Sequence, residues 1–391
     1  MGRKTREGNM EIWVDENIPQ GKEAFGAHGN VVTFPGRSLA NKDLRGADAL
    51  IVRSVTRVNA ELLEGTHVRF VGTATIGTDH VDQAYLGARG IGFTSAPGCN
   101  ARSVGEYVAA ALSHLETRKG FALPGRTMGI IGHGHVGKQV ERMALALGLS
   151  VLKCDPPMEA ASSMRQAYVD LGTLLAKSDV ISLHVPLVRG GPHPTLHLVD
   201  AGFFARLKHP VALLNTCRGE VIRESDLLVA RAQGLIRHLV LDVFSGEPRI
   251  DPALCAQADL ITPHIAGYSL PGKLNGTRDV AVAFRNFFGL ADGWAPALPS
   301  PERPEIIHSP DFSARPDSDF RQTCIERAYD IAADDKRLRQ ALASAEPAAA
   351  FDRLRREYPV RHEFPAFRVT ALPRDKAQLG KSLNNLGFQV G

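Results

Sequence analysis

Three charged or ionisable side chains in the second half of the chain each follow an apolar, strand-like stretch. Arg218 stands in "VALLNTCRGE", Glu247 in "HLVLDVFSGEP" and His264 in "DLITPHIAGYS". Neutral imidazole can accept a proton near pH 7, and a carboxylate can orient that imidazole and stabilise its protonated form. Guanidinium can hold a substrate carboxylate through two parallel hydrogen bonds. Together these residue types suit the oxidation of a 2-hydroxy acid, and we expect them to be catalytic.

A glycine-rich turn precedes these three stretches. In "TMGIIGHGHVGKQVERMALALG", Gly132, Gly134 and Gly137 have the G-x-G-x-x-G spacing between an apolar strand and an amphipathic helix. This arrangement binds the pyrophosphate of a dinucleotide at a helix N-terminus. We expect His135 and Val136, in the same turn, to contact the cofactor as well. The alternative interpretation is a glycine turn in an ordinary α/β domain.

An acidic residue follows the glycine turn at the distance that a dinucleotide site requires. The strand-like "SVLKCDPP" ends in Asp155, 18 residues after Gly137, where a carboxylate meets the adenosine ribose hydroxyls. Because a carboxylate there repels a 2′-phosphate, the sequence predicts NAD rather than NADP as the cofactor. Lys153 carries the opposite charge two residues earlier and weakens this preference.

Strand ends must bring these residues together. From Met10 to about Gly289, short apolar segments alternate with helical patterns, which predicts parallel sheets with helices on both faces. Ligands bind beyond the carboxyl ends of such strands, so the three stretches should meet at the nicotinamide end of a dinucleotide. We predict an α/β fold with two doubly wound parallel-sheet domains, one flavodoxin-like and one Rossmann-like, plus a smaller α+β C-terminal domain.

The chain is too long for one ordinary domain. We predict a substrate-binding domain from residues 10–104 and 269–295, and an NAD-binding domain from residues 105–268 inserted into it. A Pro-rich linker, "DGWAPALPSPERP", precedes a third segment at residues 300–391, which could be a regulatory or a dimerisation domain. Its helix-rich pattern fits a dimerisation domain better.

The composition restricts the class of protein. With 44% hydrophobic and 23% charged residues and a net charge of +4 without a long basic block, we expect a soluble protein with an anionic small-molecule ligand and no nucleic acid. The five cysteines form no C-x-x-C pair, so we expect no metal site and a cytoplasmic location. No apolar run reaches membrane-spanning length, and the basic N-terminal residues should form a short disordered extension before Met10.

The segments "GHGHVG", "NTCRGEVI", "LDVFSGEP" and "TPHIAGYS" resemble signatures of the D-isomer-specific 2-hydroxyacid dehydrogenases. Within that family, "VDENIP", "VRSVTRVN" and "FVGTATIGTDHVD" resemble the branch that acts on 4-phospho-D-erythronate. The resemblance implies NAD-dependent oxidation of this compound to 2-oxo-3-hydroxy-4-phosphobutanoate, a step of vitamin B6 biosynthesis, by a homodimer. His264 would transfer the proton.

The resemblance also implies further contacts. The implied cofactor-binding residues are Asp155, Thr216, Cys217, Asp242 and Gly267, and the implied substrate-binding residues are Ser54, Thr75 and Tyr268. Val185 stands where relatives could carry a hydroxyl residue, so only its backbone could contact the cofactor.

The substrate phosphate needs donors of its own. Arg53 and Ser54, in the strand-end turn "IVRSVTRVN", form a cation-plus-hydroxyl set suited to an oxyanion, although a solvated turn explains them equally well. The segment 353–362, "RLRREYPVRH", could also add charge to the site, but a solvated basic helix is the simpler interpretation.

Two other functions remain open. The substrate could be another 2-hydroxy acid, such as 3-phosphoglycerate, or the chain could be a non-catalytic, NAD-sensing corepressor. The sequence does not determine whether the cofactor leaves after each turnover or is reoxidised in place by a 2-oxoacid.

Overall fold

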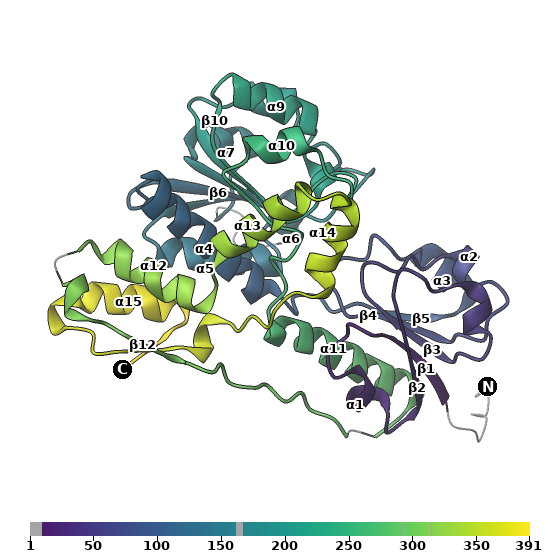
Figure 1. Ribbon diagram of the computed structural model, residues 1–391. Coiled ribbons are helices and arrows are strands. Elements are labelled where there is room, and N and C mark those ends of the chain that lie inside the picture. The colour runs from purple at the N-terminus through teal and green to yellow at the C-terminus, as the bar shows by residue number, and fades with distance from the viewer. Residues whose placement is uncertain (1–9, 162–166, 292, 314) are drawn as a thin grey trace. The chain divides into compact units, whose positions relative to one another are not determined.

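The computed structural model describes residues 10–161, 167–291, 293–313 and 315–391 (Figure 1). The chain divides into two compact units. The first unit comprises Met1–Asn100 and Leu270–Pro299, and the second comprises Ala101–Ser269 and Ser300–Gly391. The disordered extension that the sequence predicts falls on residues 1–9, outside the described residues.

The first unit contains a five-stranded parallel sheet with the order β2-β1-β3-β4-β5, the flavodoxin-like order that the sequence predicts. Its strands are β1 (Met10–Asp15), β2 (Gly29–Phe34), β3 (Ala49–Val52), β4 (Phe70–Thr73) and β5 (Gly92–Thr94). Its helices are α1 (Gly21–Phe25), α2 (Ala60–Leu63), α3 (Gln83–Arg89) and α11 (Leu270–Phe288).

Both faces of this sheet are apolar. Neighbouring residues of a strand point to opposite sides, and the central strands β3 and β4 are buried at every position. Leu50 of β3 packs in one cluster and Ile51 in the other, which also contains Val280 and Phe284 of α11. A Cβ at Gly72 would come within 2.4 Å of Val280, so glycine is what allows α11 to approach the sheet closely. The helix predicted after "ITPHIAGYS" is therefore confirmed as a core element of the first unit.

The second unit contains a six-stranded parallel sheet with the order β11-β10-β9-β8-β6-β7. Its strands are β6 (Thr127–Ile131), β7 (Ser150–Cys154), β8 (Val180–Leu183), β9 (Val211–Asn215), β10 (Ile236–Leu241) and β11 (Leu260–Ile261). The helices around it are α4 (Ala101–Lys119), α5 (His135–Ala146), α6 (Pro156–Ala161), α7 (Leu171–Lys177), α8 (Ala201–Phe204), α9 (Glu224–Ala232) and α10 (Pro252–Gln257).

The strand order of the second sheet is the flavodoxin-like order with one more strand at the β11 edge. In the described residues, the chain between β7 and β8 forms the helices α6 and α7 and no strand. The order reverses at β6, which is flanked by β7 and β8. The glycine turn at the end of β6 therefore lies at the point where ligands bind in open parallel sheets. The predicted α/β fold with doubly wound parallel sheets is confirmed.

Residues 300–391 add a three-stranded parallel sheet to the second unit, with the order β12-β13-β14. Its strands are β12 (Glu305–Ile307), β13 (Arg368–Thr370) and β14 (Gln389–Val390), and its helices are α12 (Asp317–Ala328), α13 (Ile331–Leu342), α14 (Pro347–Arg356) and α15 (Ala377–Leu386). The strand β12 lies directly after the Pro-rich linker and was not predicted.

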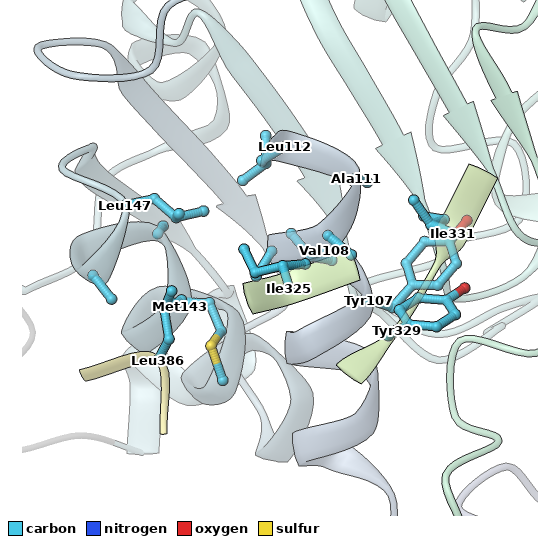
Figure 2. Packing of buried hydrophobic residues seen from close by; sticks show 14 of the residues in the cluster. Tyr107, Val108, Ala111, Leu112, Met143, Leu147, Ile325, Tyr329, Ile331 and Leu386 are labelled. Carbon is cyan, nitrogen blue, oxygen red and sulfur yellow. The ribbon is translucent and has the colours of Figure 1, made fainter. Parts of the chain in front are cut away.

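The C-terminal segment shares a hydrophobic core with the six-stranded sheet (Figure 2). Helix α12 packs on α4, α15 packs on α5, and α13 packs against β11. Figure 2 shows Ile325 of α12 beside Val108 of α4, and Leu386 of α15 beside Met143 of α5. The segment 300–391 is thus held firmly against the helices that cover one face of the sheet.

Candidate active site

The imidazole of His264 is paired with the carboxylate of Glu247. Nδ1 of His264 lies 2.8 Å from Oε2 of Glu247, and Oε1 of Glu247 accepts a hydrogen bond from the amide of Phe244 at 3.0 Å. Burial by itself raises the pKa of Glu247, but the imidazole of His264 and the guanidinium of Arg355 outweigh burial, so the net pKa lies below its ordinary value. Glu247 is therefore a carboxylate that can orient His264 and stabilise its protonated form.

A buried aspartate shapes the loop that carries His264. Asp242, just after β10, accepts hydrogen bonds from the Thr262 hydroxyl at 2.6 Å and from the amides of Ile265 at 2.8 Å and Ala266 at 2.9 Å. Burial raises the pKa of Asp242 to about 6 in spite of these donors. Both of its carboxylate oxygens serve the loop, so the structure gives Asp242 a structural task beside its predicted contact with the cofactor.

The backbone of His264 has a conformation that non-glycine residues rarely adopt. Its φ is 56°, in the left-handed region, and its amide donates to the carbonyl oxygens of Asp242 at 2.7 Å and Thr262 at 3.0 Å. Such strain costs about 1 kcal/mol or more and gathers at functional sites. The neighbouring Ile265 and Ala266 are buried, as packing residues should be.

Arg218 follows β9 in a turn that an asparagine organises. The Asn215 side chain accepts a hydrogen bond from the Cys217 amide at 3.1 Å and donates to the Arg218 carbonyl at 2.9 Å. Nη1 of Arg218 donates to the Cys217 carbonyl at 2.7 Å. A Cβ at Gly219 would lie 1.9 Å from the carbonyl carbon of Phe244, so this turn packs tightly on the segment before Glu247. Asn215 was missed at the sequence level, where it reads as an ordinary strand-end residue.

The three catalytic candidates follow neighbouring strands. Because β9, β10 and β11 are adjacent and parallel, Arg218, Glu247 and His264 all lie in loops beyond the same edge of the sheet. This is the edge at which the glycine turn after β6 also lies. The structure thus places the predicted proton-transfer pair and the predicted cofactor turn on one edge.

The glycine turn has the geometry needed to hold a pyrophosphate. Gly132 has a φ of 91°, which favours glycine, and a Cβ at Gly137 would lie 2.2 Å from the Gly132 carbonyl oxygen. No atom comes within 4 Å of a Cβ built at Gly134, which begins α5 as its N-cap. The turn, with His135 and Val136 in the first turn of α5, therefore leaves room for an anion at the helix N-terminus.

The charges near Asp155 favour a free ribose over a 2′-phosphate. Oδ2 of Asp155 accepts from the His133 amide at 2.7 Å, which places the carboxylate at the glycine turn. Nζ of Lys153 lies 2.9 Å from Oε1 of Glu141, and Glu141 also lies 2.7 Å from Nε2 of His133. The positive charge of Lys153 is thus paired with Glu141. It therefore no longer weakens the preference for NAD over NADP.

Three other predicted cofactor residues, Val185, Thr216 and Cys217, follow the ends of β8 and β9. Thr216 Oγ1 lies 3.3 Å from Nδ1 of His184, whose Nε2 lies 2.8 Å from the Ser182 hydroxyl. Burial lowers the pKa of His184 to about 3, so its ring is neutral. A Cβ at Gly132 would come within 2.9 Å of Val185, so Val185 packs on the glycine turn. Gly267 lies in the loop after His264.

Tyr268, a predicted substrate contact, touches the C-terminal segment. Its hydroxyl accepts a hydrogen bond from Nη2 of Arg355 at 3.2 Å, and its ring packs edge-on against Tyr358 with centroids 5.8 Å apart. Arg355 is buried, whereas Arg353 and Arg356 of the same helix are exposed. A solvated basic helix is therefore the wrong interpretation for Arg355.

The predicted substrate residues of the first unit form their own group. Nε of Arg53 lies 3.0 Å from Oδ1 of the buried Asp15, and Ser54 is exposed beside it. The Thr75 hydroxyl lies 2.8 Å from the Thr73 hydroxyl and 3.1 Å from the Gly77 carbonyl, to which it donates. Arg53 therefore carries a charge that Asp15 partly offsets.

Comparison with known proteins agrees with this geometry. A profile described as "D-isomer specific 2-hydroxyacid dehydrogenase, NAD binding domain" matches residues 101–266, and a domain of unknown function, DUF3410, matches residues 298–387. A curated erythronate-4-phosphate dehydrogenase from Edwardsiella ictaluri is 44% identical over 381 residues, which are 97% of this chain and 99% of the relative. The chain belongs to the erythronate-4-phosphate dehydrogenase family. An erythronate-4-phosphate dehydrogenase from Hahella chejuensis is 43% identical over 384 residues, with coverage of 97% and 99%.

Solved structures of 2-hydroxyacid dehydrogenases have a similar fold. D-lactate dehydrogenase from Aquifex aeolicus, complexed with NAD and lactic acid, is 25% identical with a TM-score of 0.60 over 71% of this chain and 95% of that one. NAD-bound 3-phosphoglycerate dehydrogenase from Entamoeba histolytica has a TM-score of 0.62 and 24% identity, covering 72% and 96%, and shares the fold. The NAD-binding profile and the curated relatives together show that the chain is an NAD-dependent dehydrogenase, and the predicted cofactor is confirmed.

Two further observations concern metals and membranes. Within the ranges that the structure describes, no group of three or more His, Cys, Asp and Glu side chains could hold a metal ion. In the same ranges, no helix combines the length and the apolar character needed to cross a bilayer. All five cysteines are buried, as small apolar side chains would be.

Proposed function

We propose that this chain oxidises 4-phospho-D-erythronate to 2-oxo-3-hydroxy-4-phosphobutanoate with NAD as the hydride acceptor, in vitamin B6 biosynthesis. The observation that carries the proposal is the 2.8 Å pair of His264 and Glu247, on the sheet edge that holds the glycine turn. The names of the curated relatives support the substrate.

The chemistry divides between the cofactor and the protein. When bound, NAD supplies the hydride acceptor, held by the turn of Gly132, Gly134 and Gly137 and by the carboxylate of Asp155. Nδ1 of His264 is oriented by Glu247, so Nε2 is the nitrogen that takes the proton of the C2 hydroxyl. As the imidazole becomes positively charged, the carboxylate of Glu247 stabilises it.

The remaining residues hold the substrate. Arg218 binds the C1 carboxylate, since guanidinium and carboxylate match in geometry and charge. Tyr268, Ser54 and Thr75 supply hydroxyl contacts, and Arg53 with Ser54 recognises the phosphate. The other cofactor contacts come from His135, Val136, Val185, Thr216, Cys217, Asp242 and Gly267.

The test compares three substrates with the purified chain. NADH formation, followed by absorbance, is measured with 4-phospho-D-erythronate, with D-erythronate and with 3-phosphoglycerate. We expect the highest kcat/KM for 4-phospho-D-erythronate. A preference for 3-phosphoglycerate would assign a different 2-hydroxy acid, and turnover of none would favour a non-catalytic, NAD-sensing protein.

We further propose that the protein is a cytoplasmic homodimer and that residues 300–391 form its dimerisation domain. Side chains of this segment leave apolar surface exposed, with Ile307 on the edge strand β12 at 62% and Val360 at 66% exposure. Light scattering on the intact protein distinguishes a dimer from a monomer. Buried, unpaired cysteines suit a reducing compartment.

A further inference from the structure

Helix α14 of the C-terminal segment places one guanidinium directly behind the proton-transfer pair. Nη1 of Arg355 lies 3.8 Å from Oε2 of Glu247, which is the oxygen that holds His264. Nη2 donates to the Tyr268 hydroxyl, and the guanidinium lies over the Tyr268 ring at 5.8 Å. Only 9% of Arg355 is exposed, and its Nε has no hydrogen-bond partner.

We propose that Arg355 is a positioning residue of the active site, which fixes the Tyr268 hydroxyl and sets how readily the Glu247–His264 pair holds a proton. This inference rests on the function proposed above and assigns a task to a segment that matches a domain of unknown function. Arg355 acts through Glu247 and Tyr268 and is not itself the acid, the base or the carboxylate-binding residue.

Two more side chains of the C-terminal segment hold the same loop from behind. Arg361 donates to the Ala266 carbonyl at 2.6 Å and also to the Ser103 hydroxyl, and Glu363 accepts from the Ser269 hydroxyl at 2.7 Å. These contacts hold backbone and a loop end. Arg355 differs because it is the member of this group that reaches the Glu247 carboxylate.

A task in proton transfer follows from the charges. Three charged or titratable groups are linked to the pair: Arg355 acts on Glu247, the buried carboxyl of Asp242 is coupled to His264, and the Tyr268 hydroxyl acts on Arg355. Burial opposes the charge of Arg355, but Tyr268 and Glu247 raise its pKa above the ordinary value, so it stays charged. A fixed positive charge beside Glu247 competes with protonated His264 for one carboxylate oxygen and therefore disfavours the protonated imidazole.

The helix itself explains how an arginine comes to be buried here. Phe351 and Arg355 are four residues apart and lie on the same face of α14. Phe351 packs in the hydrophobic cluster of the second unit, and the face that it anchors carries Arg355 to Glu247. Arg356, one position further on, is exposed and paired with Glu357 at 3.1 Å.

The test uses Arg355→Gln, Arg355→Lys and the matched control Arg356→Gln. The pH dependence of kcat for 4-phospho-D-erythronate oxidation is measured with KM, and NADH binding by fluorescence verifies that each variant is folded. For Arg355→Gln we expect kcat to fall about tenfold, and the acid limb to move up by about half a pH unit, since neutral imidazole is needed for oxidation. Arg355→Lys should leave the acid limb at the wild-type pH but raise KM. An ammonium keeps the positive charge but cannot reproduce the two-pronged guanidinium contact with Tyr268 and Glu247. Arg356→Gln should match the wild type.

A folded Arg355→Gln with the kcat and pH dependence of the wild type would overturn the proposal. If Arg355→Gln is too unstable to assay, Arg355→Lys decides, and an unchanged KM in that variant would overturn it. Loss of activity without a shift of the acid limb would also contradict it, because a merely structural role predicts that pattern. No turnover by the wild type would contradict the proposed function instead.

Discussion

Nδ1 of His264 lies 2.8 Å from Oε2 of Glu247, although 17 positions separate the two residues in the chain. The loops that carry them follow the neighbouring strands β10 and β11. The carboxylate of Asp242 holds the His264 loop in place. This pair assigns the two ring nitrogens: one faces the carboxylate and the other is left for the substrate.

Replacing Glu247 with glutamine tests the carboxylate of the pair. Glu247→Gln keeps the shape of the side chain but removes the charge that stabilises protonated His264. We expect kcat to fall by about 100-fold and the acid limb of the pH dependence to move to lower pH, because neutral imidazole then persists further into acid. The shift is opposite in sign to that expected for Arg355→Gln. If the acid limbs of Glu247→Gln and Arg355→Gln shifted equally and in the same direction, the proposed charge arrangement would be contradicted.

The φ of 56° at His264 predicts a gain in stability from glycine. Alanine keeps the left-handed strain and glycine relieves it. The free energy of unfolding of His264→Gly should therefore exceed that of His264→Ala by about 1 kcal/mol. Urea unfolding of the two inactive variants measures this difference. An alanine variant at least as stable as the glycine variant would show that the loop is not strained at this residue.

The neutral His184 predicts acid sensitivity. Its pKa is about 3 in the folded protein because of burial, and about 6.5 when unfolded. Between these values the unfolded chain binds a proton that the folded protein cannot, so stability is present above pH 6.5 and falls by up to about 1.4 kcal/mol per unit as the pH drops. The melting temperature of His184→Asn should therefore fall less between pH 7 and pH 5 than that of the wild type. The exposed His193→Asn is the control, and parallel curves for all three proteins would contradict the assignment.

Arg53 is the proposed phosphate contact. Its side chain is 18% exposed and paired with Asp15, so Arg53→Ala also leaves a buried carboxylate without its charged partner. The measurement is therefore the ratio of kcat/KM for 4-phospho-D-erythronate to that for D-erythronate, in which the folded fraction cancels. We expect the ratio to fall at least about tenfold. The exposed Arg57→Ala is the control, and an unchanged ratio in Arg53→Ala would remove Arg53 from phosphate recognition.

Local patterns predicted much of the fold and of the site. Glycine spacing identified the turn at Gly132, and the apolar stretches before Arg218 and His264 identified β9 and β11, because such features depend on a few neighbouring residues. The contribution of Arg355 depends on its contact with Glu247, which is far away in the sequence. Such a contact follows from the packing of distant segments, and no local pattern describes it. The sequence did contain one indication that Arg355 is buried: it stands four residues after Phe351, which places the two side chains on the same face of a helix.

Polar residues with structural tasks were also hard to recognise. Asn215 organises the turn that carries Arg218 through hydrogen bonds to residues two and three positions further on. Asp242 holds a loop more than 20 residues away, which no local pattern describes. In both cases the hydrogen-bond partners are backbone groups, and these have no signature in the sequence.

The most direct measurement is NADH formation from 4-phospho-D-erythronate by the wild type and by His264→Ala. We expect robust turnover by the wild type and a fall in kcat of about 1,000-fold or more in the variant, while the Kd for NAD stays within about threefold, because His264 transfers the proton and does not hold the cofactor. Comparable kcat values in the two proteins, with NAD binding intact, would contradict the assignment of His264 as the catalytic acid/base.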